Sequence, residues 1–115
     1  MKRADWERLE RAARRVVEAT LAELPPEIQA DARAVPCLLQ EWNEADPALL
    51  GLYSDFAPGE VSEANGPIIL YLAAIEDYCL DEDGDFEDEV RLTFLHELGH
   101  HFGWGEGELE ERGLG

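Results

Sequence analysis

Basic side chains are almost missing from the chain after residue 33. Only Arg91 and Arg112 of the nine lysines and arginines lie there, together with twenty of the 27 acidic residues. The first 33 residues carry equal numbers of acids and bases, so the whole formal charge of −18 arises from the remainder. Such a charge repels phosphate groups and argues against nucleic acid and anionic membranes as partners. It favours cations, either metal ions or basic peptides.

Long apolar runs and clustered cysteines are also missing. No stretch approaches the ~18 consecutive apolar residues of a membrane helix, and the charged N-terminus differs from a secretion signal. We therefore expect a soluble, cytoplasmic protein. The two cysteines, Cys37 and Cys79, lack the spacing of a metal or redox motif. Reduced thiols are expected in a reducing compartment, with a disulfide as the alternative for a thermophilic source.

The apolar residues that are present, 45% of the chain with 9% aromatics, are enough for a folded core. The length of 115 residues predicts a single domain over residues 1–115. Residues 5–23 have helical apolar spacing with Asp5 as a candidate N-cap, and residues 27–33 could add a short helix. Three segments of strand length follow: residues 34–42, 49–56 and 68–72.

Acidic residues dominate the chain after the third strand segment. Residues 77–84 are predicted to form a polar loop, and Asp85 to N-cap a helix that continues to Phe102. Gly103 suits the left-handed position at which a chain turns after a helix. The predicted fold is α+β, a small three- to four-stranded sheet packed with an N-terminal helix and a C-terminal helix.

The C-terminal helix carries His96-Glu97-Leu98-Gly99-His100, the His-Glu-x-x-His pattern. Positions four apart lie about 40° apart on a helix, so both imidazoles can bind one tetrahedral Zn²⁺. Glu97 lies about 60° from His100, close enough to act on a water beside the metal without having to bind the metal. His101 is interpreted as a packing residue or a residue that supports the ligands, rather than as a ligand.

A third ligand must come from beyond the end of this helix. Gly103 permits the required turn, and Glu106 follows it by three residues, which completes the pattern His-Glu-x-x-His-x-x-Gly-x-x-Glu. Spacing favours Glu106 over the other nearby glutamates. These alternatives are Glu108, Glu110 and Glu111.

With this motif the chain resembles the zincin metallopeptidases, and within them a family of small bacterial zincin-like proteins with a minimal fold. The similar segments span nearly the whole chain: Glu23–Pro25, Leu50–Tyr53, Pro58, Ile68–Tyr71 and Thr93–Gly103. The resemblance implies a metal-dependent peptidase with His96, His100 and Glu106 as zinc ligands. Glu97 would be the catalytic base. Metzincins differ, since they use a third histidine and a later Met-turn, and the only methionine here is Met1.

The predicted activity is hydrolysis of a peptide bond by a water that Zn²⁺ polarises and Glu97 deprotonates. The substrate would be a peptide or protein, preferably basic, paired with the edge of the sheet near residues 68–72. Candidate donors to the developing oxyanion are Tyr53, Tyr71 and Tyr78.

Two other functions remain open at this stage. One is a metal-binding interaction or regulatory module that retains the site without general proteolytic activity. The other is a narrow regulatory protease that needs a partner to complete its cleft.

Overall fold

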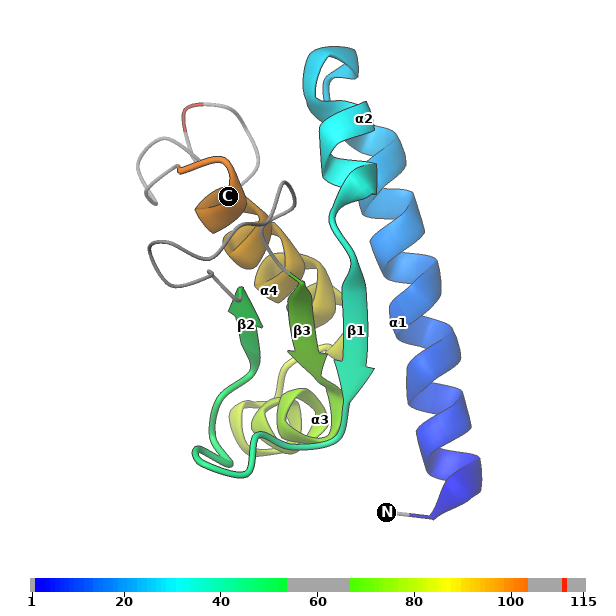
Figure 1. Ribbon diagram of the computed structural model, residues 1–115. Helices are drawn as coiled ribbons and strands as arrows, with labels where there is room; N and C mark the ends of the chain where they lie inside the picture. The colour runs from blue at the N-terminus through cyan, green and yellow to red at the C-terminus, as the bar shows by residue number, and fades with distance from the viewer. Residues whose placement is uncertain (1, 54–66, 104–110, 112–115) are drawn as a thin grey trace.

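The computed structural model describes residues 2–53, 67–103 and 111, which form helices around a small sheet (Figure 1). In chain order the elements are α1 (Arg3–Glu23), α2 (Pro26–Ala34), β1 (Cys37–Gln40), β2 (Gly51–Tyr53), β3 (Ile68–Tyr71), α3 (Leu72–Glu82) and α4 (Phe86–His101). The α+β fold class is therefore confirmed. None of the helices in the described part of the chain is long and apolar enough to cross a bilayer.

The sheet has the strand order β1-β3-β2, with β3 in the centre. β1 pairs with β3 in parallel and places Cys37 opposite Ile68, whereas β2 pairs antiparallel and places Gly51 opposite Leu70. The prediction that a substrate could pair near residues 68–72 is wrong, because neighbouring strands occupy both sides of β3. Of the described strands, β1 and β2 provide the edges of the sheet.

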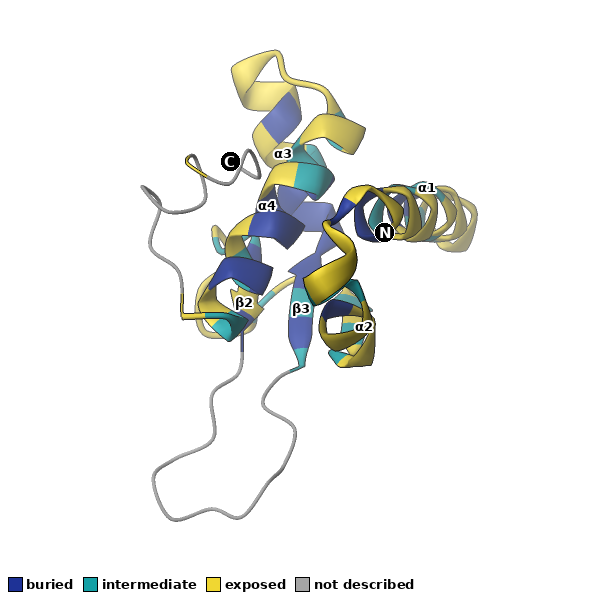
Figure 2. Ribbon diagram, turned by 90° about the horizontal axis from the view of Figure 1, so that it is seen from above, coloured by how far each residue is buried: buried dark blue, intermediate teal, exposed yellow. Residues whose placement is uncertain are grey.

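α4 packs against both helices and strands. It contacts α1, α3, β2 and β3. Its apolar side is buried at Val90, Phe94 and Leu98, where each side chain is at most 2% exposed. Figure 2 shows buried residues along α4 and β3, while the outer sides of α1 and α2 are exposed. The helix that bears the histidine motif is therefore part of the core.

Both ends of α4 follow the sequence prediction. The carboxylate of Asp85 accepts a hydrogen bond of 3.0 Å from the backbone N–H of Asp88 and caps the first turn. At the other end Gly103 has a φ of +74°, and its N–H donates to the carbonyl of His100 at 3.1 Å. The histidines thus lie in the last turns of a helix that is held at both termini.

Two predicted features are wrong. Residues 77–84 are not a loop, because α3 continues to Glu82. Its C-cap is Asp83, which has a φ of +54°. Ile75 and Cys79 are buried one turn apart on α3, and this apolar side is enough to form a helix although four of its eleven residues are acidic. Asp5 does not cap α1 either. It lies in the first turn, and Lys2 is the N-cap.

The other predicted elements are in place, with shorter strands. α2 includes residues 27–33, which were predicted as a short helix, and β1 and β2 lie inside the predicted strand segments. Residues 54–56 of the second segment lie outside the described residues.

The cysteines are free thiols, as predicted. Cys79 is buried on α3, and Cys37 is half-buried on β1. Burial raises the pKa of the Cys37 thiol to about 11. This thiol therefore stays protonated at neutral pH and is a poor nucleophile.

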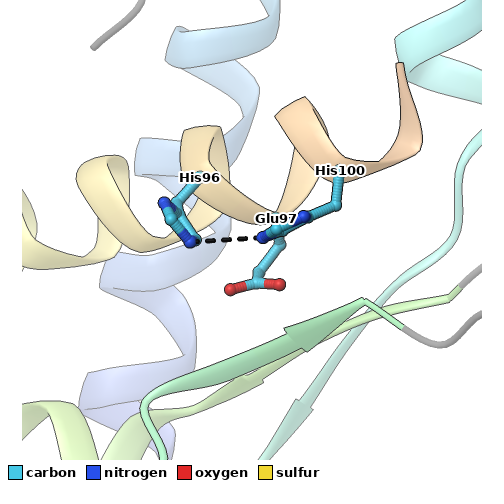
Figure 3. Close-up of side chains that lie close together, drawn as sticks. All are labelled: His96, Glu97 and His100. Atoms are coloured by element: carbon cyan, nitrogen blue, oxygen red, sulfur yellow. Dashed lines mark hydrogen bonds between the residues drawn. The ribbon is translucent and has the colours of Figure 1, made fainter. Parts of the chain in front are cut away.

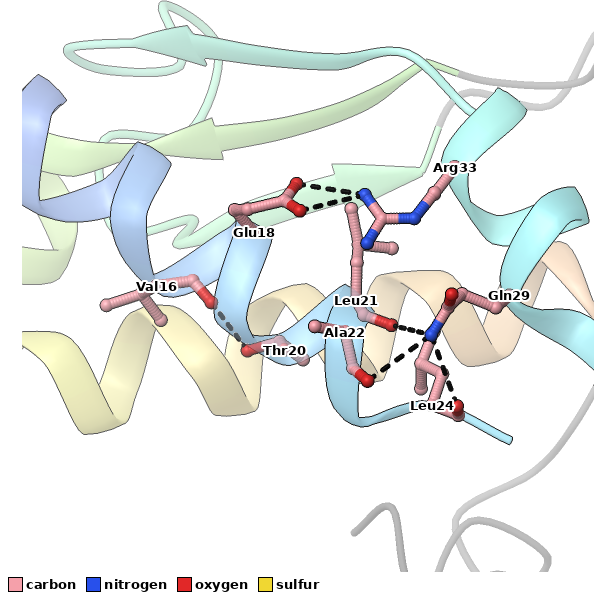
Figure 4. A network of polar contacts seen from close by, with 8 residues as sticks. All are labelled: Val16, Glu18, Thr20, Leu21, Ala22, Leu24, Gln29 and Arg33. Atoms are coloured by element: carbon pink, nitrogen blue, oxygen red, sulfur yellow. Dashed lines mark hydrogen bonds and ion pairs between the residues drawn. The ribbon is translucent and has the colours of Figure 1, made fainter. Parts of the chain in front are cut away.

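The junction of α1 and α2 is held by side chains from α2 (Figure 4). The amide nitrogen of Gln29 donates to the carbonyls of Leu21, Ala22 and Leu24 at 3.0, 3.3 and 3.4 Å. These carbonyls lie at the end of α1, where a helix leaves acceptors without partners of its own. Arg33 also donates two hydrogen bonds to Glu18, which lower the pKa of that carboxyl. α2 is thereby fixed against α1.

Candidate metal centre

His96, Glu97 and His100 project together from α4 towards the β2 side of the sheet (Figure 3). Their potential ligand atoms all lie within 4.8 Å of one another. The Nε2 atoms of the two histidines are 3.2 Å apart. Two nitrogens bound to one tetrahedral zinc ion at about 2.05 Å would lie about 3.3 Å apart. The two imidazoles therefore already have the spacing that a shared metal ion requires.

The edge strand β2 lies close to α4 at Gly51. A Cβ atom at this position would lie 2.6 Å from Cγ2 of Thr93, 3.3 Å from the carbonyl oxygen of Ile69 and 3.4 Å from Cγ of Glu97. Only a residue without a Cβ leaves this space open. Gly51 therefore brings the backbone of an edge strand beside the predicted base. Gly51 was not among the predicted site residues, although a glycine inside a strand pattern is a signal of close backbone approach.

We expect the substitution Gly51→Ala to destabilise the protein by about 1–3 kcal/mol, because the added methyl overlaps Thr93. Urea denaturation measures this loss. In a Thr93→Ser background the interfering Cγ2 methyl is gone and the hydroxyl is kept. The cost of Gly51→Ala should therefore be clearly smaller in that background. Equal costs in the two backgrounds would contradict the close approach of β2 to α4.

A groove of about 320 Å³ opens beside His96, between β2 and α4. Leu49, Leu50 and Gly51 form one side of it. The α4 side consists of Glu89, Leu92, Thr93, His96 and Glu97. His96 and the predicted base Glu97 therefore line a groove that can receive another molecule.

Comparison with known families agrees with this geometry. Residues 15–115 match the profile of the zincin-like metallopeptidases. The chain belongs to this family. The match includes the whole of α4 and confirms the resemblance seen in the sequence motif. A search among curated proteins gives no match.

Membership of the zincin-like metallopeptidases implies a metal, typically zinc, and the donor chemistry of α4 fits one. Imidazole nitrogens are good zinc donors, and His96 and His100 present theirs from adjacent turns. The structure brings three of the four predicted site residues together. The fourth, Glu106, lies outside the described residues, as do Glu108 and Glu110.

In this zincin-like chain His101 connects the end of α4 to two other elements. Its Nδ1 is 3.1 Å from the hydroxyl of Tyr53 on β2, and its Nε2 is 3.3 Å from a carboxylate oxygen of Asp31 on α2. A carboxylate only accepts, so Nε2–H donates to Asp31, and Nδ1 and the Tyr53 hydroxyl lie within hydrogen-bond distance of each other. Both ring nitrogens have protein partners, which agrees with the interpretation of His101 as a supporting residue.

The three tyrosines that sequence analysis named as oxyanion donors lie in different surroundings. The Tyr53 hydroxyl contacts His101, and the Tyr71 hydroxyl accepts a hydrogen bond from Asn43 at 3.0 Å. Tyr78 is exposed on α3. An oxyanion role for any of them stays a prediction.

Proposed function

We propose that this protein is a zinc-dependent peptidase, with His96, His100 and Glu106 as metal ligands and Glu97 as the general base. The observation that supports it best is the 3.2 Å separation of the two Nε2 atoms, with the Glu97 carboxylate within 4.8 Å of them. When bound, zinc would lower the pKa of a water molecule and polarise the carbonyl of the substrate.

Glu97 performs the proton transfers in this proposal. Its half-buried carboxylate lies at the end of the groove, where a water and a substrate carbonyl can meet. The carboxylate accepts a proton from the attacking water as the new C–O bond forms. It then donates this proton to the amine nitrogen that leaves as the peptide bond breaks.

The substrate is an extended peptide that pairs with the outer edge of β2. The carbonyl of Leu50 accepts a hydrogen bond of 2.9 Å from the N–H of Tyr71, so these opposite residues form a hydrogen-bonded pair. Such pairs alternate along an antiparallel ladder, so the next residue, Gly51, directs its N–H and C=O away from β3. A substrate backbone can use both groups and is then held beside Glu97. The net charge of −18 favours basic peptides as substrates.

Digestion of an unbiased peptide pool tests the proposal. The zinc-loaded protein should produce new peptide termini, and a chelator should abolish them until zinc is restored. Mass spectrometry of the pool identifies the termini. Stoichiometric zinc without any cleavage would overturn the peptidase proposal and favour the metal-binding module that keeps the site without proteolysis.

A further inference from the structure

The groove beside the candidate metal centre runs along α4. Leu49 and Leu50 line it together with Glu89 and Leu92, near the start of the helix. Further along β2, the Tyr53 hydroxyl reaches His101 at the end of the helix. β2 and α4 therefore advance in the same direction.

A peptide bound antiparallel to β2 runs the opposite way. With its scissile bond beside Glu97, its amino-terminal part lies towards His101. Its carboxyl-terminal part lies over the groove between Leu50 and Glu89. The groove thus receives the residues that follow the scissile bond.

Glu89 carries the charge at the far end of this groove. It lies seven residues before His96, which places the two on the same face of α4 and about 10 Å apart along the helix axis. An extended peptide advances about 3.3 Å per residue, so this distance spans about three residues. No lysine or arginine of the described residues lines the groove. By contrast, the neighbouring Glu87 pairs with Arg15 at 2.8 Å.

The groove combines this carboxylate with apolar surface. Leu92 is 47% exposed, and Leu49 and Leu50 are half-buried. Lysine and arginine side chains have the same two parts, an apolar stem and a cationic end. The stem can lie on the leucines while the cation meets the half-buried Glu89.

We propose that Glu89 selects a lysine or arginine within the first three residues after the scissile bond. This selection deepens the proposed peptidase function and rests on it for the position of the scissile bond. The overall negative charge favours basic peptides without regard to position, whereas Glu89 confines the preference to one side of the cleaved bond.

A pair of peptides tests the selection, one with lysine and one with norleucine at each of the three positions after the cleaved bond. Norleucine keeps an apolar stem and lacks the charge. The wild type should prefer lysine by about fivefold in kcat/KM, as expected for a partly solvated ion pair. Glu89→Gln should bring the ratio close to one. In the peptide pool, lysine and arginine should be enriched at the three positions after the cleavage sites and lose this enrichment in E89Q.

Asp88→Asn is the matched control. Asp88 also lies in the first turn of α4, so the variant removes one negative charge from the same helix end. Asp88 does not line the groove, and D88N should retain the lysine preference of the wild type. Cleavage without enrichment of basic residues at the three positions, or an enrichment that E89Q leaves unchanged, overturns the role of Glu89 while the peptidase function stands.

Measurements of peptide binding test the role of Glu89 independently of the proposed peptidase activity. In zinc-loaded Glu97→Gln, the lysine peptide should bind about fivefold more tightly than the norleucine peptide, and additional Glu89→Gln should remove the difference. If the wild type cleaves nothing and this difference is present, the groove selects basic peptides and the peptidase proposal fails. Equal binding of the two peptides by E97Q overturns the selection, whatever the activity.

Discussion

Glu97→Gln is expected to lower kcat/KM for peptide cleavage by about 100- to 10,000-fold, the usual contribution of a general base. Glutamine has nearly the same shape as glutamate, but its amide cannot take the proton from the attacking water. Zinc content should remain stoichiometric, because in the proposal the metal is held by His96, His100 and Glu106. Cleavage assays and metal analysis on the same preparation measure both effects.

Asp88→Asn serves as the control for the loss of one negative charge on α4. Its carboxylate lies outside the groove, so this variant should cleave a neutral peptide at the wild-type rate. Wild-type cleavage by zinc-loaded E97Q would contradict the role of Glu97 as base. Loss of zinc from E97Q would instead show that Glu97 is needed to hold the metal.

The features of the site that could be predicted are local in sequence. His96, Glu97 and His100 lie within two turns of one helix, so helix geometry alone brings them to one side. The cap at Asp85 and the turn at Gly103 are equally local, since each depends on hydrogen bonds to residues three positions away. For this reason α4 and its ends agree with the sequence prediction.

The features that were missed depend on contacts between distant segments. β3 was identified as a strand, but its central place depends on pairing with β1 and β2, which sequence patterns do not specify. Gly51 meets Thr93 only because β2 packs on α4, and His101 meets Asp31 across 70 residues of chain. The groove and its Glu89 follow from the same packing and could not be read from the motif.

The error at α3 has another origin. The acidic composition from Asp77 onward favours a solvated loop, whereas the spacing of the apolar residues favours a helix. The apolar residues Leu72, Ile75 and Cys79 recur at intervals of three and four and are all buried. An acidic segment can thus be a helix when its few apolar residues share one face and find a partner. Here that partner is α4.

His96→Ala is expected to weaken zinc binding by more than the ~10- to 100-fold that loss of a supporting residue usually costs, because it removes a direct donor. The remaining imidazole of His100 would be left without the second nitrogen that now lies 3.2 Å away. Zinc retained after dialysis against a competing chelator measures the loss. Cleavage should disappear together with the metal.

The helix itself should survive this substitution, since alanine has a higher helix propensity than histidine. Unchanged far-UV circular dichroism together with lost zinc would therefore assign the effect to ligation rather than to unfolding. Glu97→Gln, which should keep its zinc, is the matched variant at the adjacent position. Stoichiometric zinc in H96A under the same dialysis would remove the basis of the metal site, because the spacing of His96 and His100 is the observation on which the assignment depends.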